Sequence, residues 1–417
     1  MTNRRDFIKG SLTTGLFAAS SGKILQSCSP SIKSKKLEEK LNESVLDLSE
    51  ITAPVIIDKL DLFRKNGEYI VKVVSEDGDV GIALANRIRM YFSYPIMIEK
   101  VIPHFIGKDA RAIENLVDDV YRNHSNYKYQ GLPFWVCVAA VELSILDLLG
   151  KLTEKSIGQL FGNIVRTDVP VYRAFNNRGK PPEKSVRIIK RVLSEEQQFD
   201  AIKFKIGGRM EYNEKTMQRD RQLIPLLRKE LGDQITIYSD ANGSFDVPAA
   251  IEIGRILEDN QIAFFEEPCP FDHYDETKKI ADKLTIRIAG GEVESSLWMF
   301  KWMLEKEAVQ VVQPDLHYFG GMIRATKVAR MAEECNIPIT LHISGCSLGF
   351  VYMLHFAAVT PNLGEYQEFK DLNTKIPFEC PTSTLKSKNG KIKVPTGPGF
   401  GIKIDPGIFK FAEKLSA

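Results

Sequence analysis

The chain has 417 residues, 43% of them hydrophobic and 26% charged, so it can bury a large core and is too long for one small domain. Its formal charge is +2, and beyond the first 28 residues it carries 52 Lys and Arg against 53 Asp and Glu. A nearly neutral chain without a long basic cluster offers little attraction for nucleic acid. We therefore expect no nucleic-acid partner.

The first 28 residues have the pattern of an export signal. Arg4-Arg5-Asp6-Phe7 precedes a mildly apolar stretch at 10–22, which is too short to span a bilayer. The segment resembles a twin-arginine signal. Leu25-Gln26-Ser27-Cys28 is similar to a lipoprotein cleavage box, which would leave Cys28 lipidated. We expect an exported, periplasmic protein that meets the membrane only through this leader or a lipid anchor at Cys28; the alternative is a disordered basic N-terminus.

The segment after the leader predicts a linker and then an α+β domain. Residues 29–50 are rich in Ser, Lys and Glu, which is typical of a polar linker. Alternating apolar residues predict antiparallel strands at 56–63, 69–74 and 80–84. Apolar residues spaced by three and four predict helices at 95–104, 113–121 and 134–150. We assign residues 55–165 to a capping domain.

From residue 169 the pattern changes to short apolar runs that alternate with helical stretches. The predicted strands lie at 169–175, 201–206, 235–239, 263–265, 286–289, 308–312, 338–341 and 366–369. Such alternation favours a parallel sheet, and seven or eight units in series favour its closure. We predict a (β/α)7-8 TIM-type barrel over 169–385, with the segment 386–417 returning to the capping domain.

A chemically active side chain stands at the end of most of these predicted strands. The series comprises Lys203, Lys205, Asp240, Glu266, Glu292, Asp315, His342 and Glu368. In a (β/α)8 barrel the C-terminal ends of the strands surround one mouth, so these side chains converge. The spacing therefore predicts a single site.

Three of these residues, Asp240, Glu266 and Glu292, are carboxylates that end neighbouring predicted strands. Such a set of hard oxygen ligands suits Mg2+, with Mn2+ as an alternative. One acid alone is more often a helix cap or a surface residue, so the prediction rests on the three occurring together. Glu267 could replace Glu266, because strand alternation lets only one of the two face inward.

The remaining members of the series suggest two bases on opposite sides of the site. Lys203 and Lys205 alternate on one strand and so point to the same face. We expect these two cations to depress each other's pKa, which would help to keep one amine neutral as a base. Asp315 beside His342 would orient the imidazole as a second base. A lysine pair at a strand edge and a structural histidine are the alternatives.

One further acid closes the predicted ring. Glu368 would lie opposite the metal and meet the substrate, with Glu365 as the alternative.

Together these motifs resemble the enolase superfamily, specifically its mandelate racemase branch, over most of residues 55–410. They are K-x-K at 203, D-x-N at 240, E-E-P at 266, G-G-E at 290, Q-P-D at 313 and the strand-end His342. The resemblance implies that Mg2+ holds a carboxylate substrate while a base removes its α-proton, and that the metal and Lys203 stabilise the enediolate. It implies an acid-sugar dehydratase. A racemase, epimerase or cycloisomerase on a sugar acid or lactone is one alternative, and a non-catalytic sugar-acid binding protein is another.

Three more residues are candidates for substrate contact, although each taken alone is more often a surface or packing side chain. They are His273, His317 and Tyr318. The five cysteines after Cys28 are widely and irregularly spaced, which predicts buried thiols rather than a disulfide framework. We expect a small-molecule carboxylate as substrate and a homo-oligomeric protein.

Overall fold

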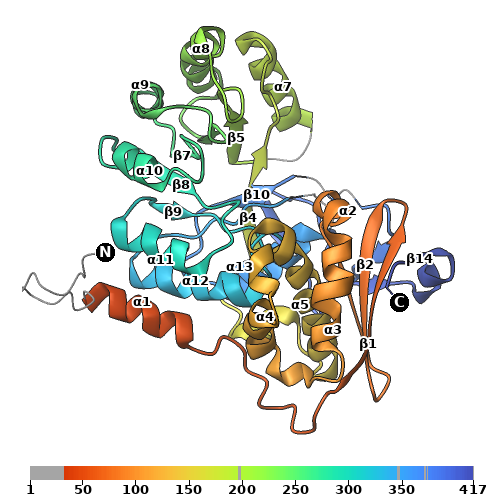
Figure 1. The fold of residues 1–417 in the computed structure, drawn as a ribbon. Helices are drawn as coiled ribbons and strands as arrows, with labels where there is room; N and C mark the ends of the chain where they lie inside the picture. The colour runs from red at the N-terminus through yellow and green to blue at the C-terminus, as the bar shows by residue number, and fades with distance from the viewer. Residues whose placement is uncertain (1–31, 196–198, 345–347, 371, 373, 417) are drawn as a thin grey trace, which may run out of the picture.

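The computed structural model describes residues 32–195, 199–344, 348–370, 372 and 374–416. The predicted leader, with Cys28, lies outside the described residues. Figure 1 shows an α+β domain, mostly orange, beside a larger green-to-blue region in which strands and helices alternate. The cysteines that the structure describes, Cys137, Cys269, Cys335 and Cys380, are all free.

An antiparallel sheet in the order β14-β1-β2-β3 forms one side of the first domain. Its strands are β1 (Ile57–Lys65), β2 (Glu68–Ser75), β3 (Val80–Leu84) and β14 (Glu413–Lys414). Asn66 and Gly67 join β1 to β2, and both have the positive φ that a tight hairpin of this kind requires. Because β14 pairs with β1, the C-terminal segment returns to this domain.

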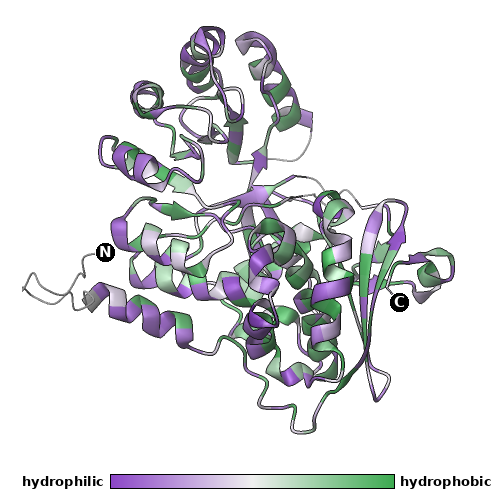
Figure 2. Cartoon of the chain, in the orientation of Figure 1, coloured by the Kyte–Doolittle hydropathy of each residue, from purple (hydrophilic) through white to green (hydrophobic). Residues whose placement is uncertain are grey.

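Helices cover this sheet. They are α2 (Arg87–Ile96), α3 (Ile102–Phe105), α4 (Ile113–Arg122), α5 (Leu132–Leu152) and α6 (Ile157–Phe161), with the short turns η1 (Met97–Val101), η2 (Ala110–Ala112) and η3 (Asn126–Tyr129). The helix α5 is long and apolar enough to cross a membrane, but its residues from Phe134 to Gly150 are all buried in the protein. Figure 2 shows hydrophobic residues concentrated on α5, as expected of a core helix.

The second domain is a curled parallel sheet of the TIM-barrel type, as the sequence predicts. The strands follow chain order from β4 to β9, and β10 pairs with β4. Their bounds are β4 (Asp168–Ala174), β5 (Ala201–Lys205), β6 (Thr236–Asp240), β7 (Phe264–Glu266), β8 (Arg287–Gly290), β9 (Val311–Val312) and β10 (Gln367–Phe369). The helices are α7 (Pro182–Glu195), α8 (Glu214–Leu231), α9 (Val247–Asp259), α10 (Tyr274–Ala281), α11 (Leu297–Lys306), α12 (Met322–Glu334) and α13 (Gly349–Val359).

The ring is completed between β9 and β10 by single bridges rather than by a regular strand. Ile339 forms parallel bridges to Val312 on one side and to Leu363 on the other. Pro338 has no N–H to donate to a ladder, which helps to explain why the predicted strand at 338–341 is reduced to bridges. The C-terminal segment adds β11 (Phe378–Glu379), β12 (Lys391–Lys393), β13 (Lys403–Ile404) and η4 (Pro406–Phe411), and β12 pairs antiparallel with β4.

A buried carboxyl group connects the two domains. Glu142 on α5 accepts a hydrogen bond of 2.9 Å from the backbone N–H of Ile323, in the first turn of α12. Gly321 leaves room for this contact, because a Cβ there would stand 1.1 Å from a Glu142 carboxyl oxygen. Burial raises the pKa of Glu142 to about 8. The barrel helix α12 is therefore capped by the other domain.

The segment predicted as a linker, 29–50, instead contains a docked helix, α1 (Ile32–Asn42). Leu37 and Leu41, one turn apart, are buried and form an apolar stripe in an otherwise polar sequence. The helix packs on α11 and α12, and Lys36 pairs with Glu334 at 2.8 Å. The polar composition of the segment predicts a linker, because it has few apolar residues. Two buried leucines are nevertheless enough to dock a short helix once a matching surface exists.

Truncation of Leu37 should therefore destabilise the protein. We expect Leu37→Ala to lower the free energy of unfolding by about 2–5 kcal/mol through lost burial and a residual cavity. Lys35→Ala, on the exposed side of the same helix, should stay within about 0.5 kcal/mol of the wild type. Calorimetric melting of the three proteins measures the difference, and equal effects of the two substitutions would show that α1 is not docked in solution.

Candidate active site at the barrel mouth

The register of the parallel strands brings the predicted residues to one level. Lys205 pairs with Asp240 between β5 and β6, and Asp240 pairs with Glu266 between β6 and β7. All three stand at the C-terminal ends of their strands. Because side chains alternate along a strand, Lys203 shares the inward face with Lys205, whereas Phe204 belongs to the apolar layer under the helices.

An apolar floor lies beneath this level. The residues two positions before Asp240 and Glu266 are Tyr238 and Phe264, whose rings stack with their centroids 4.0 Å apart. They belong to a small interior cluster with Tyr172, Ala201, Ala289 and Val311. The same period of two that sets this floor therefore points the carboxylates into the barrel interior above it.

The three predicted carboxylates gather in space. One oxygen from each of Asp240, Glu266 and Glu292 lies within 4.8 Å of the others, and all three residues are buried. Glu267, the alternative, is also buried but lies outside this triad; its backbone turns to a positive φ of 42° and its carboxyl faces the Asn242 amide. The structure thus brings Glu266, and not Glu267, into the triad.

The charges around the triad fit a divalent cation. The site contains six buried carboxyl groups but only three ammonium groups. The carboxyl groups belong to Asp240, Glu266, Glu267, Glu292, Asp315 and Glu368, and the ammonium groups belong to Lys203, Lys205 and Lys370. Among the described residues, Oε2 of Glu292 has no hydrogen-bond partner although it is buried. Buried anions need pairing or a metal, and carboxylate oxygens are the ligands that Mg2+ prefers.

Both lysines make ion pairs with carboxylates of the site. Lys203 is fully buried, with Nζ 2.7 Å and 2.8 Å from the two Glu266 oxygens and 3.0 Å from Glu368. Burial lowers the pKa of Lys203, but the carboxylates of Glu266 and Glu368 outweigh it and raise the pKa well above its usual value. The expectation that the lysine pair depresses both pKa values is therefore wrong for Lys203.

Lys205 lies closer to the opening. Its Nζ contacts Asp240 and lies 3.1 Å from Oδ1 of Asn242. Burial raises the pKa of Asp240, but the ammonium groups of Lys205 and Lys203 outweigh it and hold the pKa well below its usual range. Asp240 is thus ionised, which a metal ligand must be.

A histidine and an aspartate meet on another arc of the ring. Nδ1 of His342 lies 2.8 Å from Oδ2 of Asp315, and the two residues form a parallel bridge. The other Asp315 oxygen accepts the backbone N–H groups of His317 and Tyr318. Because Nδ1 of His342 is bonded to Asp315, the other ring nitrogen, Nε2, faces the interior of the site. Nε2 lies 3.6 Å from Oε2 of Glu292. β6 to β9 separate this arc from Lys205 on one side, and β10 and β4 separate it on the other.

Glu368 closes the ring, and Glu365 does not. Glu368 is fully buried on β10 and accepts the backbone N–H of Ile343 at 2.8 Å, whereas Glu365 is exposed. Burial raises the pKa of Glu368, but Lys203 and Lys370 outweigh it and bring the pKa well below its usual value.

One residue of the mouth was missed by the sequence reasoning. Lys370 stands two positions after Glu368, so both point to the same side of the chain. Its Nζ lies 3.1 Å from Glu368, 3.3 Å from Nε2 of His342 and 2.6 Å from the Ile343 carbonyl. The available signal was an E-x-K pair that mirrors the K-x-K of β5.

The three candidates for substrate contact lie in different surroundings. His317 is buried with its ring 5.4 Å from that of Tyr352, which is a packing role. Tyr318 stands 6.1 Å from the His342 ring, and its hydroxyl accepts a hydrogen bond from Arg89 of the capping domain.

The structure does not bring His273 to the site, because its imidazole is exposed and pairs with Glu276 on α10. Asn86 of the capping domain also reaches the barrel, at Ser344.

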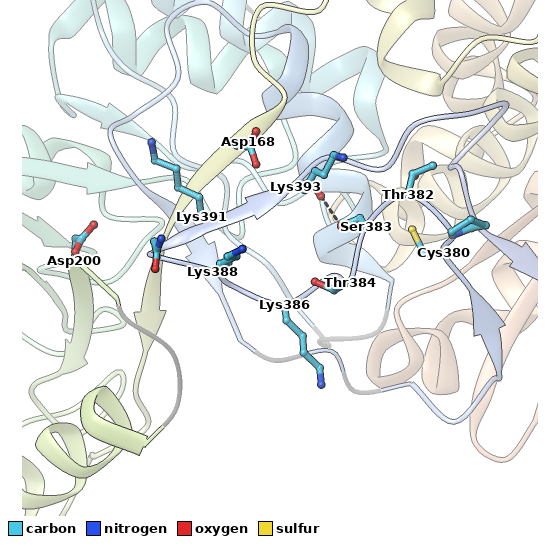
Figure 3. Close-up of a pocket in the computed structure, with 12 residues that line it drawn as sticks. Asp168, Asp200, Cys380, Thr382, Ser383, Thr384, Lys386, Lys388, Lys391 and Lys393 are labelled. Atoms are coloured by element: carbon cyan, nitrogen blue, oxygen red, sulfur yellow. Dashed lines mark hydrogen bonds between the residues drawn. The ribbon is translucent and has the colours of Figure 1, made fainter.

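A separate cavity of about 780 Å³ lies at the other end of the barrel (Figure 3). It is lined by Lys386, Lys388, Lys391 and Lys393, beside Asp168 at the start of β4 and Asp200 just before β5. Active sites of such barrels lie at the C-terminal ends of the strands, so this cavity is distinct from the candidate site.

Two family profiles match the chain, one on each domain. The profile "Enolase C-terminal domain-like" matches residues 186–408, and "Mandelate racemase / muconate lactonizing enzyme, N-terminal domain" matches residues 63–162. The chain belongs to the enolase superfamily. It is an enzyme of this superfamily, whose members generally use Mg2+, and its buried acidic triad could hold such an ion.

Named relatives of this enolase-superfamily chain act on sugar acids or their lactones. It is 29% identical over 342 residues to arabinonate dehydratase of Saccharolobus solfataricus, covering 81% of this chain and 88% of that protein. It is 25% identical over 351 residues to D-galactarolactone cycloisomerase of Agrobacterium fabrum, covering 82% and 90%. A solved mandelate racemase/muconate lactonizing protein from Paracoccus denitrificans shares the fold, with a TM-score of 0.77, 24% identity and coverage of 87% and 99%.

Metal affinity should separate Glu266 from its neighbour. We expect Glu266→Gln to weaken Mg2+ binding at least about a hundredfold, because it removes one of three anionic ligands. Glu267→Gln should change the affinity little, because the Glu267 carboxyl lies outside the triad and faces the Asn242 amide. Titration calorimetry with Mg2+ measures both, and circular dichroism confirms folding. Equal Mg2+ affinities in the two variants would show that Glu266 is not a metal ligand.

Proposed function

We propose that the protein is a Mg2+-dependent dehydratase of sugar acids. The proposal rests on one arrangement, in which a buried triad of carboxylates stands between an amine, Lys205, and an imidazole held by a carboxylate, His342 with Asp315. An α-proton next to a carboxylate is weakly acidic, so its removal needs a positioned base and cationic groups that offset the developing charge.

Each side chain has a distinct part in this proposal. Asp240, Glu266 and Glu292 hold the ion, which when bound would offset negative charge on the substrate carboxylate. Lys203, fixed by Glu266 and Glu368, directs its fixed positive charge at the same carboxylate.

Proton transfer belongs to the groups on either side of the triad. Lys205 is the base that accepts the α-proton. The His342 side then assists the departure of the β-hydroxyl, so that water and the enol of a keto-deoxy acid are formed.

A second reaction uses the same groups. If the His342 side returns a proton to the α-carbon, or assists the opening or closing of a lactone ring, the protein is a racemase, epimerase or cycloisomerase. The likeness to D-galactarolactone cycloisomerase at 25% identity favours this alternative over other classes. The greater identity to arabinonate dehydratase, 29%, places dehydration first.

Proton NMR in D2O with Mg2+ and a panel of sugar acids and lactones tests the proposal. A keto-deoxy acid product supports dehydration, and a ring-opened, ring-closed or epimeric product supports the alternative. A panel that binds without α-deuteration or product would identify a non-catalytic binding protein and overturn the proposal.

Variants assign the reaction to this site. Lys205→Met and His342→Asn should each lower the dehydration rate by about 10²–10⁴-fold, because the first removes the proposed base and the second removes the imidazole that lines the opposite side of the site. His124→Asn is the matched control for the histidine, since His124 is exposed in the capping domain and has a positive φ that Asn tolerates. Unchanged rates in the Lys205 and His342 variants would place the reaction elsewhere.

We also propose that the protein is exported folded by a twin-arginine route and faces the periplasm, with Cys28 as a lipid anchor. The support is the sequence Arg4-Arg5 ahead of the apolar stretch and Cys28. In a bacterial host, Arg4→Lys combined with Arg5→Lys should retain the protein in the cytoplasm, and Cys28→Ala should release it from the membrane fraction. Cell fractionation reads out both, and unchanged distributions would contradict the two assignments separately.

A further inference from the structure

Lys370 occupies a place in the mouth that neither the metal triad nor the Lys205 base accounts for. Its ammonium group has three donors, and three acceptors surround it: the Ile343 carbonyl, Glu368 and Nε2 of His342. Its side chain is 28% exposed, whereas Lys203 is fully buried. Lys370 is therefore anchored at its tip, and its side chain remains partly exposed.

A purely structural role for Lys370 explains only part of these contacts. Glu368 already has Lys203 at 3.0 Å and the Ile343 N–H at 2.8 Å, so its charge is compensated without a third partner. The contact with Nε2 of His342, at 3.3 Å, is the one that ion pairing does not require. That nitrogen is the atom of the imidazole that faces the interior.

The hydrogen-bond network assigns the protons on this side of the site. Asp315 can only accept, so Nδ1 of His342 carries the proton between them. An ammonium group can only donate, so Nε2 accepts from Lys370 and carries no proton. A departing oxygen that approaches Nε2 therefore meets a lone pair there, and the available proton is on Lys370.

We propose that Lys370 is a catalytic residue, the proton donor to the β-oxygen of the substrate, which deepens the proposed dehydratase function and rests on it. The α C–H bond breaks as its proton moves to Lys205. The electron pair that it leaves forms the new double bond, and the C–O bond breaks with its pair going to oxygen. That oxygen takes a proton from Nζ of Lys370 and leaves as water. The substrate class is thereby narrowed to acids with a hydroxyl group on the β-carbon.

The test separates α-proton removal from elimination in the metal-loaded enzyme. In D2O, Lys370→Met should lower the rate of keto-deoxy acid formation at least about a hundredfold, because general-acid help is lost. The α-deuterium exchange catalysed by Lys205 should stay within a few-fold of the wild-type rate. The ratio of exchange to elimination therefore rises, which a merely structural defect would not produce.

Two further variants complete the experiment. Lys370→Arg keeps the charge and the donors but does not give up a proton at ordinary pH, so it should retain exchange and remain slow in elimination. Lys375→Met, at an exposed lysine nearby in the sequence, should match the wild type in both reactions.

The outcomes have separate meanings. A parallel loss of exchange and elimination in Lys370→Met, or wild-type elimination in Lys370→Arg, would overturn the role of Lys370 while leaving the dehydratase assignment intact. A wild-type enzyme that carries out neither reaction on β-hydroxy sugar acids would overturn the proposed function and this proposal together.

Discussion

The ion pairs of one fully buried lysine organise the mouth of this barrel. A charged ammonium group inside a protein is costly unless carboxylates surround it, and Lys203 has Glu266, Glu368 and Asp240 within 4 Å. These three acids come from β7, β10 and β6, so satisfying one charge fixes side chains on strands far apart in the chain. The carboxylates in turn exceed the ammonium groups in number, which leaves the site suited to a divalent cation.

The rest of the structure holds this arrangement in place. Stacked Tyr238 and Phe264 form the floor from which Asp240 and Glu266 rise, so the ring of charges stands on a packed layer. The capping domain is attached by buried contacts rather than by a loose linker. Glu142 caps α12, and Arg89 donates to Tyr318 beside His342. The mouth is therefore shaped by both domains, although every predicted acid and base comes from the barrel.

Much of the site could be predicted because barrel strands repeat one geometry. The pattern of a polar residue at the end of each apolar run predicts that five residues share one site, and the structure brings them together. They are Asp240, Glu266, Glu292, Asp315 and His342. Predictions about isolated residues did less well. His273 follows Glu266 closely in the sequence, but it lies on the exposed start of α10. The segment that forms α1 predicts a linker from its polar composition, because two leucines in a charged segment indicate a packed helix only once α11 and α12 provide a surface.

The sequence by itself determined the strand rhythm, the kinds of chemical group at the strand ends and the order in which they surround the barrel, because periodicity and strand alternation are local properties. The tertiary structure alone decided that Glu266 rather than Glu267 joins the triad, that Glu368 rather than Glu365 closes the ring, and that Lys370 reaches His342. The same holds for the high pKa of Lys203. These outcomes depend on which charges meet across the barrel, and pairing between strands distant in the chain leaves no local signature.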